Sequence, residues 1–224
     1  MYWHDLNEKR IQQLRNWLQG KRLLIVGNSV KLLHSECGQL IDSYDAVVRI
    51  GKGLPSPKLE NKLGNKMDIW FSGMLRAGLY SRVNCQWKIL TPSTSSTYDD
   101  SALFIPTNKA LFSTNFQPYK HYFWSDSVES TKAFWSLLGF TKDVRPSQGI
   151  ICVDFFARRV KHTNIDIIGF DFFTETINIG GVEYNSWHMP SRITANETAH
   201  NGSIERHIVE ALVENSLVNL LEYK

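Results

Sequence analysis

Three short stretches of the chain carry polar side chains at positions where ligand chemistry could take place. The first is Gly27-Asn28-Ser29, which ends the apolar run that starts at Leu23. A glycine at the end of a strand lets a ligand approach the main chain, and the amide and hydroxyl that follow can hydrogen-bond it. The sequence has neither the G-x-G-x-x-G pattern nor the P-loop pattern of nucleotide sites. Because the same residues are common in structural turns, this stretch alone does not identify a ligand.

The second stretch is RPSQG, residues 145–149, which opens a predicted helix. Pro146 is typical of a first helical turn. Ser147, Gln148 and Gly149 would then present main-chain N–H groups to an anion or a nucleotide. A plain helix cap, with Ser147 satisfying the first N–H groups, explains the same residues.

The third stretch is His200-x-x-x-x-Glu205, at the start of the last predicted helix. A histidine at a helix N-terminus has its pKa lowered by the helix dipole, which suits a neutral general base. The spacing turns the two side chains apart, so they do not form a metal-binding pair on one helix face. A solvent-exposed histidine beside a cap is the structural alternative.

Strands and helices alternate along the chain. Apolar runs predict strands at residues 22–26, 45–50 and 67–73, from 87 and from 164, with a short candidate at 101–107. Periodic apolar residues and capping patterns predict helices at residues 1–20, near 36–41, and at 127–139, 145–161 and 201–221. Residues 54–66 are predicted to be a polar loop.

This alternation predicts one α/β domain over residues 1–224, with an N-terminal helix at 1–20 and an α/β core at 21–224. We expect a Rossmann-like, mostly parallel sheet with helices on both faces, because the strands are apolar without alternation. Ligands of such sheets bind at the carboxyl ends of strands. The loop at Gly27, the strand-end Arg49 and the segment after Gly169 are all at such ends.

Composition excludes several classes of protein. The chain has 224 residues, 42% of them apolar, and a net charge of +3, so a nucleic-acid binder with a concentrated basic stripe is not indicated. The three cysteines, Cys37, Cys85 and Cys152, lack metal-ligand spacing and predict free thiols. No signal peptide or membrane-spanning run is found, and we expect a cytoplasmic protein.

The order of these blocks resembles the sialyltransferase family of the animal Golgi type, whose blocks are the large, small and very small sialylmotifs. The matching stretches, from residue 21 to about 211, are VGNS, IDSYDAVVRI, LGNK, PSQG, IDIIGFDF and H-x-x-x-x-E. The last block and the GFDF strand end also resemble the bacterial sialyltransferases of Campylobacter type. The resemblance implies a compact bacterial member with the GT-A-like variant fold of that family. It also implies inverting, metal-independent transfer of sialic acid from a CMP-activated donor to a glycan hydroxyl.

The resemblance also implies roles for individual residues. His200 would be the general base, His188 would help to stabilise the leaving phosphate, and Glu205 would support the helix. Arg145 is not carried over from the family, but its positive charge would neutralise the same phosphate. The donor nucleotide would be held by Gly27, Asn28, Ser29, Arg49, Ser147, Gln148 and Gly149. Two departures stand out. Gly51 stands where the family has an asparagine that contacts the donor, and Arg145 stands where the family often has a tyrosine. No metal and no other cofactor is expected.

Two alternatives remain open. The donor could be CMP-Kdo, and a retaining Kdo transferase would use Asp171 or Asp154 as its nucleophile. A non-catalytic nucleotide- or glycan-binding module is favoured by the missing asparagine at Gly51. For the enzyme, we expect an acceptor glycan of capsule or lipopolysaccharide, with peripheral contact between the N-terminal helix and the inner membrane.

Overall fold

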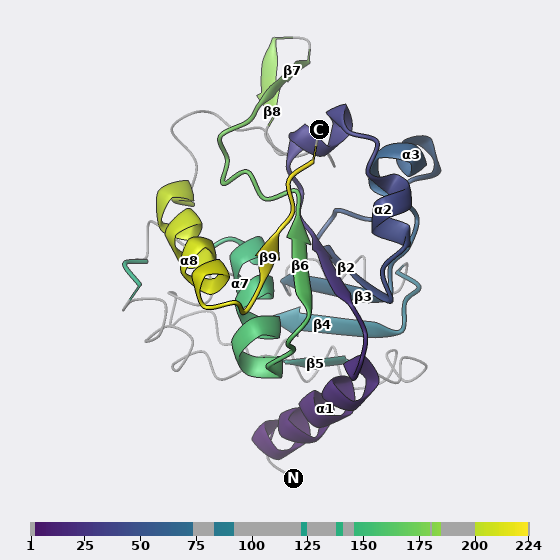
Figure 1. Ribbon diagram of the computed structural model, residues 1–224, viewed down its shortest axis with the longest axis vertical. Helices are drawn as coiled ribbons and strands as arrows, with labels where there is room; N and C mark the ends of the chain where they lie inside the picture. The colour runs from purple at the N-terminus through teal and green to yellow at the C-terminus, as the bar shows by residue number, and fades with distance from the viewer. Residues whose placement is uncertain are drawn as a thin grey trace.

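A seven-stranded sheet forms the centre of the molecule in the computed structural model (Figure 1). The structure describes residues 3–73, 83–91, 122–124, 138–140, 146–179, 181–184 and 200–223. The sheet order is β5-β4-β3-β2-β1-β6-β9, and every neighbouring pair is parallel. The strands are β1 Leu23–Val26, β2 Ala46–Ile50, β3 Ile69–Gly73, β4 Trp87–Thr91, β5 Tyr122–Trp124, β6 Ile165–Ile168 and β9 Asn219–Leu220. The predicted fold class, a mostly parallel α/β sheet, is confirmed.

The two central strands show why their sequences lack a polar face. All four residues of β1 and all five of β2 are buried. Helices cover both faces of the sheet, so no position along these strands meets water and apolar residues are favoured throughout.

One face of the sheet is covered by α1 Trp3–Leu18, α7 Gln148–Asp154, the π-helix η4 Phe155–Val160 and α8 Gly202–Glu214. Ile11, Leu14 and Leu18 of α1 are fully buried, as the predicted apolar stripe requires. A π-helical turn places consecutive residues more nearly on one side than an α-helix does. Phe155 and Phe156 accordingly both pack against Phe71 of β3, with ring centroids 5.7 and 6.4 Å away.

The opposite face is covered by short helices: η1 Val30–His34, α2 Gly38–Asp42, η2 Pro57–Leu59 and α3 Glu60–Leu63. The prediction of a loop over residues 54–66 is therefore wrong. Pro57 presets the backbone for the first turn, and Leu63 is fully buried in the core of this face. Gly38 lets α2 and α3 meet closely, since a Cβ there would lie 2.0 Å from the carbonyl oxygen of Glu60.

The end of the chain also differs from the prediction of a helix through residue 221. Helix α8 ends at Glu214, and Ser216 takes a left-handed conformation with φ of 55° that turns the chain back into the edge strand β9. A hairpin of β7 Ile177–Ile179 and β8 Val182–Tyr184 projects beyond the sheet and was not predicted.

Strand β5 was likewise not predicted. The candidate strand at 101–107 lies outside the described residues, as does the predicted helix at 127–139 up to residue 137. No helix in the described part of the chain is long and apolar enough to cross a membrane.

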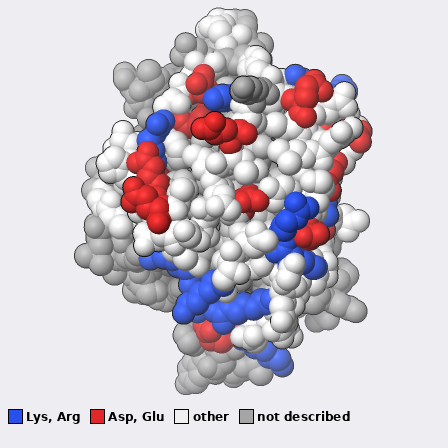
Figure 2. All heavy atoms as spheres, viewed as in Figure 1, with Lys and Arg blue, Asp and Glu red and all other residues white. Residues whose placement is uncertain are grey.

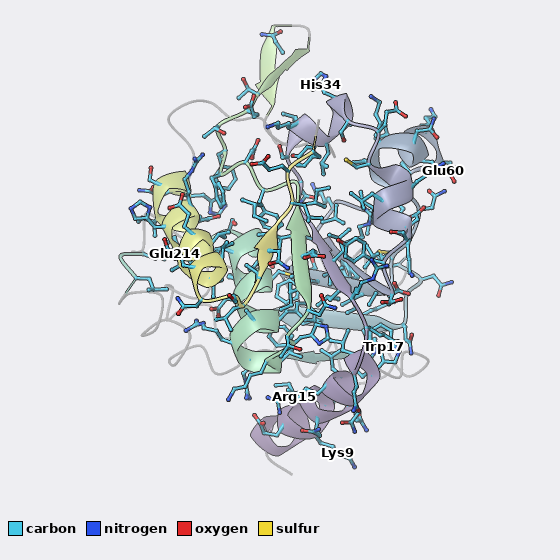
Figure 3. The ribbon with its side chains drawn as sticks, in the orientation of Figure 1. Lys9, Arg15, Trp17, His34, Glu60 and Glu214 are labelled. Atoms are coloured by element: carbon cyan, nitrogen blue, oxygen red, sulfur yellow. The ribbon has the colours of Figure 1, made fainter. Side chains whose placement is uncertain are left out.

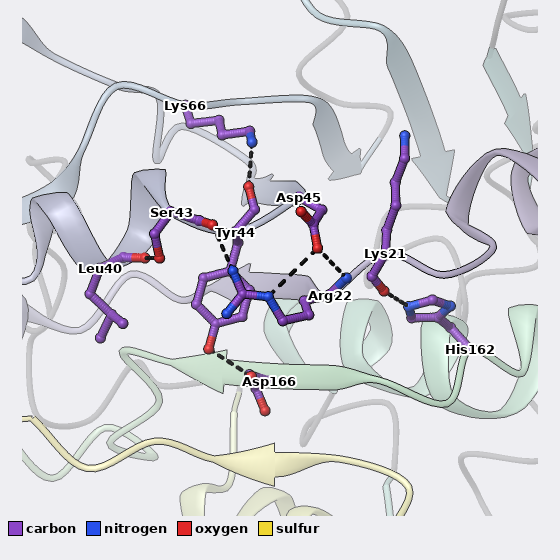
Figure 4. A network of polar contacts seen from close by, with 9 residues as sticks. All are labelled: Lys21, Arg22, Leu40, Ser43, Tyr44, Asp45, Lys66, His162 and Asp166. Carbon is purple, nitrogen blue, oxygen red and sulfur yellow. Dashed lines mark hydrogen bonds and ion pairs between the residues drawn. The ribbon is translucent and has the colours of Figure 1, made fainter.

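A polar network closes the amino ends of the strands (Figure 4). The carboxylate of Asp45 accepts a hydrogen bond from the main-chain N–H of Arg22 over 2.8 Å. The Tyr44 hydroxyl donates to Asp166 over 2.6 Å, and burial together with that carboxylate raises the pKa of Tyr44. These bonds join the starts of β1, β2 and β6. The loops after β1 and β6 lie at the opposite ends of the strands.

Candidate donor and catalytic site

The strand order has one switch point, between β1 and β6. From β1 the chain adds β2 to β5 on one side, and then returns to place β6 on the other side. The helices change faces at the same place, with η1, α2 and α3 on one face and α7 on the other. A crevice at the carboxyl ends of the two strands is the usual ligand site of such sheets. The loops that follow β1 and β6 are Gly27–Ser29 and Gly169–Phe173.

These two loops lie against each other. The main-chain N–H of Gly27 donates to the carbonyl of Ile168 over 2.7 Å, and that of Ser29 donates to Gly169 over 3.2 Å. A Cβ on Gly27 would lie 2.2 Å from the Gly169 carbonyl oxygen, closer than any side chain allows. The glycine predicted to admit a ligand is therefore also required by the contact between the loops.

Asn28 is turned toward the end of β2. Its Nδ2 donates to the carbonyl of Ile50 over 3.2 Å. Its Oδ1 is buried and has no hydrogen-bond partner among the residues that the structure describes. That atom is an acceptor, which suits a ligand hydroxyl or amino group rather than a phosphate oxygen. Nearby Gly51 has φ of 60°, a conformation that glycine and asparagine both tolerate, so the backbone at this position could also accept an asparagine.

Ser29 is buried and connects the loop Gly27–Ser29, named the donor loop for its predicted role, to Asp171. Its hydroxyl donates to Asp171 Oδ2 over 2.7 Å and accepts from the main-chain N–H of Lys31 over 3.1 Å, which caps η1. Burial raises the pKa of Asp171, against the opposing effect of the hydrogen bond from Ser29. Burial raises the pKa of Tyr223, near the end of the chain, to about 12.

Ser147 is bound to Glu205 by two hydrogen bonds. The Ser147 main-chain N–H and hydroxyl donate to the two carboxylate oxygens of Glu205, each over 2.7 Å. The same hydroxyl accepts from the Ile150 N–H over 3.2 Å and so caps α7. Glu205 is only 4% exposed, and burial raises its pKa to about 7 although the bonds from Ser147 act in the opposite direction. This is the geometry of a supporting residue that ties α8 to the start of α7.

Phe170 joins the donor loop to α7, and no role was predicted for it from the sequence. A Cβ on Gly149 would lie 3.0 Å from the Phe170 ring, and a Cβ on Gly27 would lie 3.0 Å from the same ring. The start of α7, with Gln148 and Gly149, therefore packs beside the loop after β1. The sequence feature that could have indicated this contact is an apolar residue, Phe170, directly after the glycine that ends an apolar strand.

His200 lies immediately before the N-cap of α8, as predicted. The cap is Asn201, whose side chain accepts from the N–H groups of Ser203 and Ile204 over 3.0 and 3.2 Å. The imidazole of His200 stacks on the ring of Phe173, with centroids 5.6 Å apart and planes inclined by 12°. The loop after β6 therefore reaches the predicted base as well as the donor loop.

Arg49 is the partner of Val26 in the sheet, and its side chain is held by the segment around α3. It is fully buried and donates from Nε to the carbonyl of Lys66 over 3.1 Å and from Nη2 to that of Leu63 over 2.5 Å. Burial lowers its pKa to about 10. The side chain points into the face covered by α3, so this geometry gives no support to the predicted contact with the donor. Arg145 and His188 lie outside the described residues.

The two carboxylates considered as a nucleophile, Asp171 and Asp154, are engaged in other contacts. Both oxygens of Asp171 accept hydrogen bonds, from Ser29 and from the Phe173 N–H. Asp154 forms an ion pair with Arg158. Over the ranges described, no three His, Cys, Asp or Glu side chains lie together in a way that could hold a metal ion.

Comparison with known proteins finds one sequence family and several solved structures. Residues 12–82 match the family model of glycosyltransferase family 29 (sialyltransferase). A mammalian sialyltransferase in complex with Gal-beta-1-3GalNAc-ortho-nitrophenol shares 18% identity and a TM-score of 0.52, covering 97% of this chain and 79% of its own. A second structure of a mammalian sialyltransferase shares 17% identity and a TM-score of 0.55, covering 98% and 79%.

A bacterial structure is similar to a comparable degree. The sialyltransferase CstII from Campylobacter jejuni, in complex with the substrate analogue CMP-3FNeuAc, shares 13% identity and a TM-score of 0.50, covering 89% of this chain and 79% of its own. A search of curated protein sequences finds no match. The structural matches show the fold. The family model covers the donor loop and Arg49 but not Ser147 or His200.

Proposed function

We propose that this chain, a sialyltransferase-like glycosyltransferase, transfers a sialic acid from a CMP-activated donor to a hydroxyl group of a glycan acceptor. One observation carries the proposal: the loop after β6 contacts each of the other candidate segments. Gly169 contacts Gly27, and Asp171 binds Ser29. Phe170 packs on Gly149, and Phe173 stacks on His200. Residues far apart in the sequence thus meet at the switch point of the sheet.

The comparisons support the class of donor and acceptor. CstII is recorded in complex with the substrate analogue CMP-3FNeuAc, and also with a trisaccharide acceptor and CMP. For this chain we propose that Gly27, Asn28, Ser29, Gln148 and Gly149 hold the CMP portion of the donor. The hydroxyl of Ser147 is engaged with Glu205 and Ile150, so its proposed part is to hold the start of α7 in place. We assign Arg49 to structure rather than to the donor.

The proposed reaction is a single displacement at the anomeric carbon. His200 accepts the proton of the acceptor hydroxyl while that oxygen forms its bond to the anomeric carbon. The bond from this carbon to the phosphate oxygen breaks at the same time, and CMP leaves with the electron pair. Arg145 and His188 are proposed to stabilise the negative charge that develops on the phosphate. The configuration inverts, no covalent intermediate forms, and no metal is required.

CMP-Kdo is the alternative donor, because its sugar acid is also activated as a CMP ester. A retaining reaction would need a free carboxylate beside the anomeric carbon. Of the two candidates, Asp171 is in contact with the loop after β1, but the hydrogen bonds that it accepts from Ser29 and the Phe173 N–H favour a positioning role. We therefore favour sialic acid and inversion.

We also propose a setting for the reaction in the bacterial cytoplasm, on an acceptor glycan of capsule or lipopolysaccharide. Figure 2 shows Lys and Arg side chains gathered at the lower end of the face, where Figure 1 places α1 and the end of η4. A basic surface of this kind is attracted to anionic lipid. Sedimentation with anionic vesicles that is lost at high salt would support peripheral membrane contact, and equal binding to neutral vesicles would contradict it.

Calorimetric titration with CMP, CDP, UMP, UDP and GDP, each with and without EDTA, tests the proposal. We expect preferential binding of CMP that is unchanged by EDTA. Preference for a uridine or guanosine diphosphate, or a requirement for metal, would contradict the class of donor. Turnover is then measured with CMP-sialic acid and CMP-Kdo. Tight binding of CMP without turnover of either donor on any hydroxyl acceptor would favour the non-catalytic module.

A further inference from the structure

The turn after β6 contains two bulky residues in an uncommon backbone conformation. Phe172 has φ of 55° and Phe173 has φ of 64°, both in the left-handed region. A single non-glycine residue of this size with positive φ is already an outlier, and here two follow each other. Such conformations persist only where the surrounding structure enforces them, and they are concentrated at functional sites.

Hydrogen bonds and close contacts enforce this turn. Oδ1 of Asp171 accepts from the Phe173 N–H over 3.2 Å, and the Asp171 carbonyl accepts from the Thr174 N–H and hydroxyl over 3.2 and 2.7 Å. On the other side, Gly202 of α8 lies so near that a Cβ there would be 2.0 Å from the Phe172 carbonyl oxygen. The turn is thus clamped between its own carboxylate and the start of α8.

The conformation sends the two aromatic rings to different partners. The Phe172 ring lies 5.2 Å from the guanidinium carbon of Arg206, on the second turn of α8. The Phe173 ring lies nearly parallel to the imidazole of His200, inclined by 12° at 5.6 Å. The other oxygen of Asp171 accepts from Ser29 of the donor loop over 2.7 Å. One short turn therefore contacts the donor loop and the ring of the candidate base.

We propose that Phe173 is a positioning residue that sets the ring orientation of His200, and that Asp171 fixes this turn relative to the donor loop. The inference rests on the proposed function, in which His200 is the general base. A general base must meet the acceptor proton within hydrogen-bond distance and with the right ring nitrogen. A flat aromatic surface against one face of the imidazole restricts the rotation of the imidazole ring. The edge of the imidazole, which carries both nitrogens, stays clear of the stack.

The test compares two matched substitutions, Phe173→Leu and Phe172→Leu. Each removes one aromatic ring from the same strained turn, but only Phe173 stacks on His200. We expect Phe173→Leu to lower kcat by about 10- to 100-fold, as small misplacement of a catalytic group does, with the Kd for CMP changed by less than about threefold. Phe173→Tyr retains the stack and should retain kcat. Phe173→Gly relaxes the left-handed backbone and should lose kcat like the leucine variant while remaining folded.

A spectroscopic measurement separates this proposal from the proposed function. A ring stacked on an imidazole displaces the signals of its carbon-bound protons upfield, and His200→Gln identifies which of the 7 histidine signals is involved. We expect the displacement to disappear in Phe173→Leu and to persist in Phe172→Leu. An unchanged His200 signal in Phe173→Leu, or equal losses of kcat in the two leucine variants, would overturn the positioning role. Absence of turnover in the unmodified protein would contradict the proposed function alone, since the signal still reports the stack.

Discussion

Replacing Glu205 with glutamine should flatten the pH dependence of folding stability. The carboxylate is 4% exposed and its pKa in the folded protein is about 7, against 4.5 for an ordinary glutamate. Burial disfavours the charged form more strongly than the two hydrogen bonds from Ser147 favour it. The folded protein therefore binds this proton more tightly than the unfolded chain does.

The sign and size follow from proton linkage. Because the pKa is raised on folding, the contribution of the protonated group is complete below pH 4.5 and is lost as the pH rises to about 7. Each pH unit between the two pKa values corresponds to about 1.36 kcal/mol, so this group lowers the free energy of unfolding by about 3 kcal/mol over that interval. Glutamine keeps an acceptor for the Ser147 N–H and does not titrate.

Urea unfolding at a series of pH values from about 5 to 8 measures this effect. The difference in unfolding free energy between the unmodified protein and Glu205→Gln should change by about 2 to 3 kcal/mol across the series. Glu214→Gln, at the exposed end of the same helix (Figure 3), is the matched control and should leave the curve parallel to that of the unmodified protein. If the curve of Glu205→Gln were also parallel to that of the unmodified protein, the reasoning would be refuted, because Glu205 would then be ionised over the whole pH range of the series.

Four further predictions test the site. His200→Ala should lower kcat by about 100-fold or more, as loss of a general base does, while the Kd for CMP from calorimetry stays nearly unchanged. Arg49→Met should lower the free energy of unfolding by about 1 to 3 kcal/mol, since the buried carbonyl of Leu63 and the half-buried carbonyl of Lys66 lose their donor, and folded protein should still bind CMP normally. Gly27→Ala should abolish CMP binding and destabilise the fold, because its Cβ would lie 2.2 Å from the Gly169 carbonyl oxygen. Arg145→Ala should weaken binding of CMP more than that of cytidine, because the lost charge acts on the phosphate.

Each of these predictions has a result that contradicts it. Near-normal kcat in His200→Ala would remove this residue from the reaction. Loss of CMP binding in fully folded Arg49→Met would return that arginine to the donor site. Normal CMP affinity in Gly27→Ala would show that the two loops can separate without harm. Equal losses for CMP and cytidine in Arg145→Ala would mean that the arginine does not contact the phosphate.

Local sequence patterns were sufficient for much of the fold. The apolar runs around β1, β2 and β6 predicted buried parallel strands, since covering both faces of a sheet requires apolar residues at every position. The cap at Ser147 and the helix start at residue 201 were predicted because a capping side chain bonds main-chain N–H groups only two or three residues away. The short helices over residues 57–63 were missed because their stability comes from contact with α2 rather than from their own sequence.

The sequence by itself determined which residues can carry the chemistry, because the types and order of the motif residues are properties of the chain alone. Only the tertiary structure decided how they are used. It turned Arg49 inward to the carbonyls of Leu63 and Lys66, and it bound Glu205 to Ser147, 58 positions earlier in the chain. It also brought the loop after β6 into contact with both Ser29 and His200. The direction of a side chain and its distant partner depend on how the sheet and its helices pack, which no local pattern encodes.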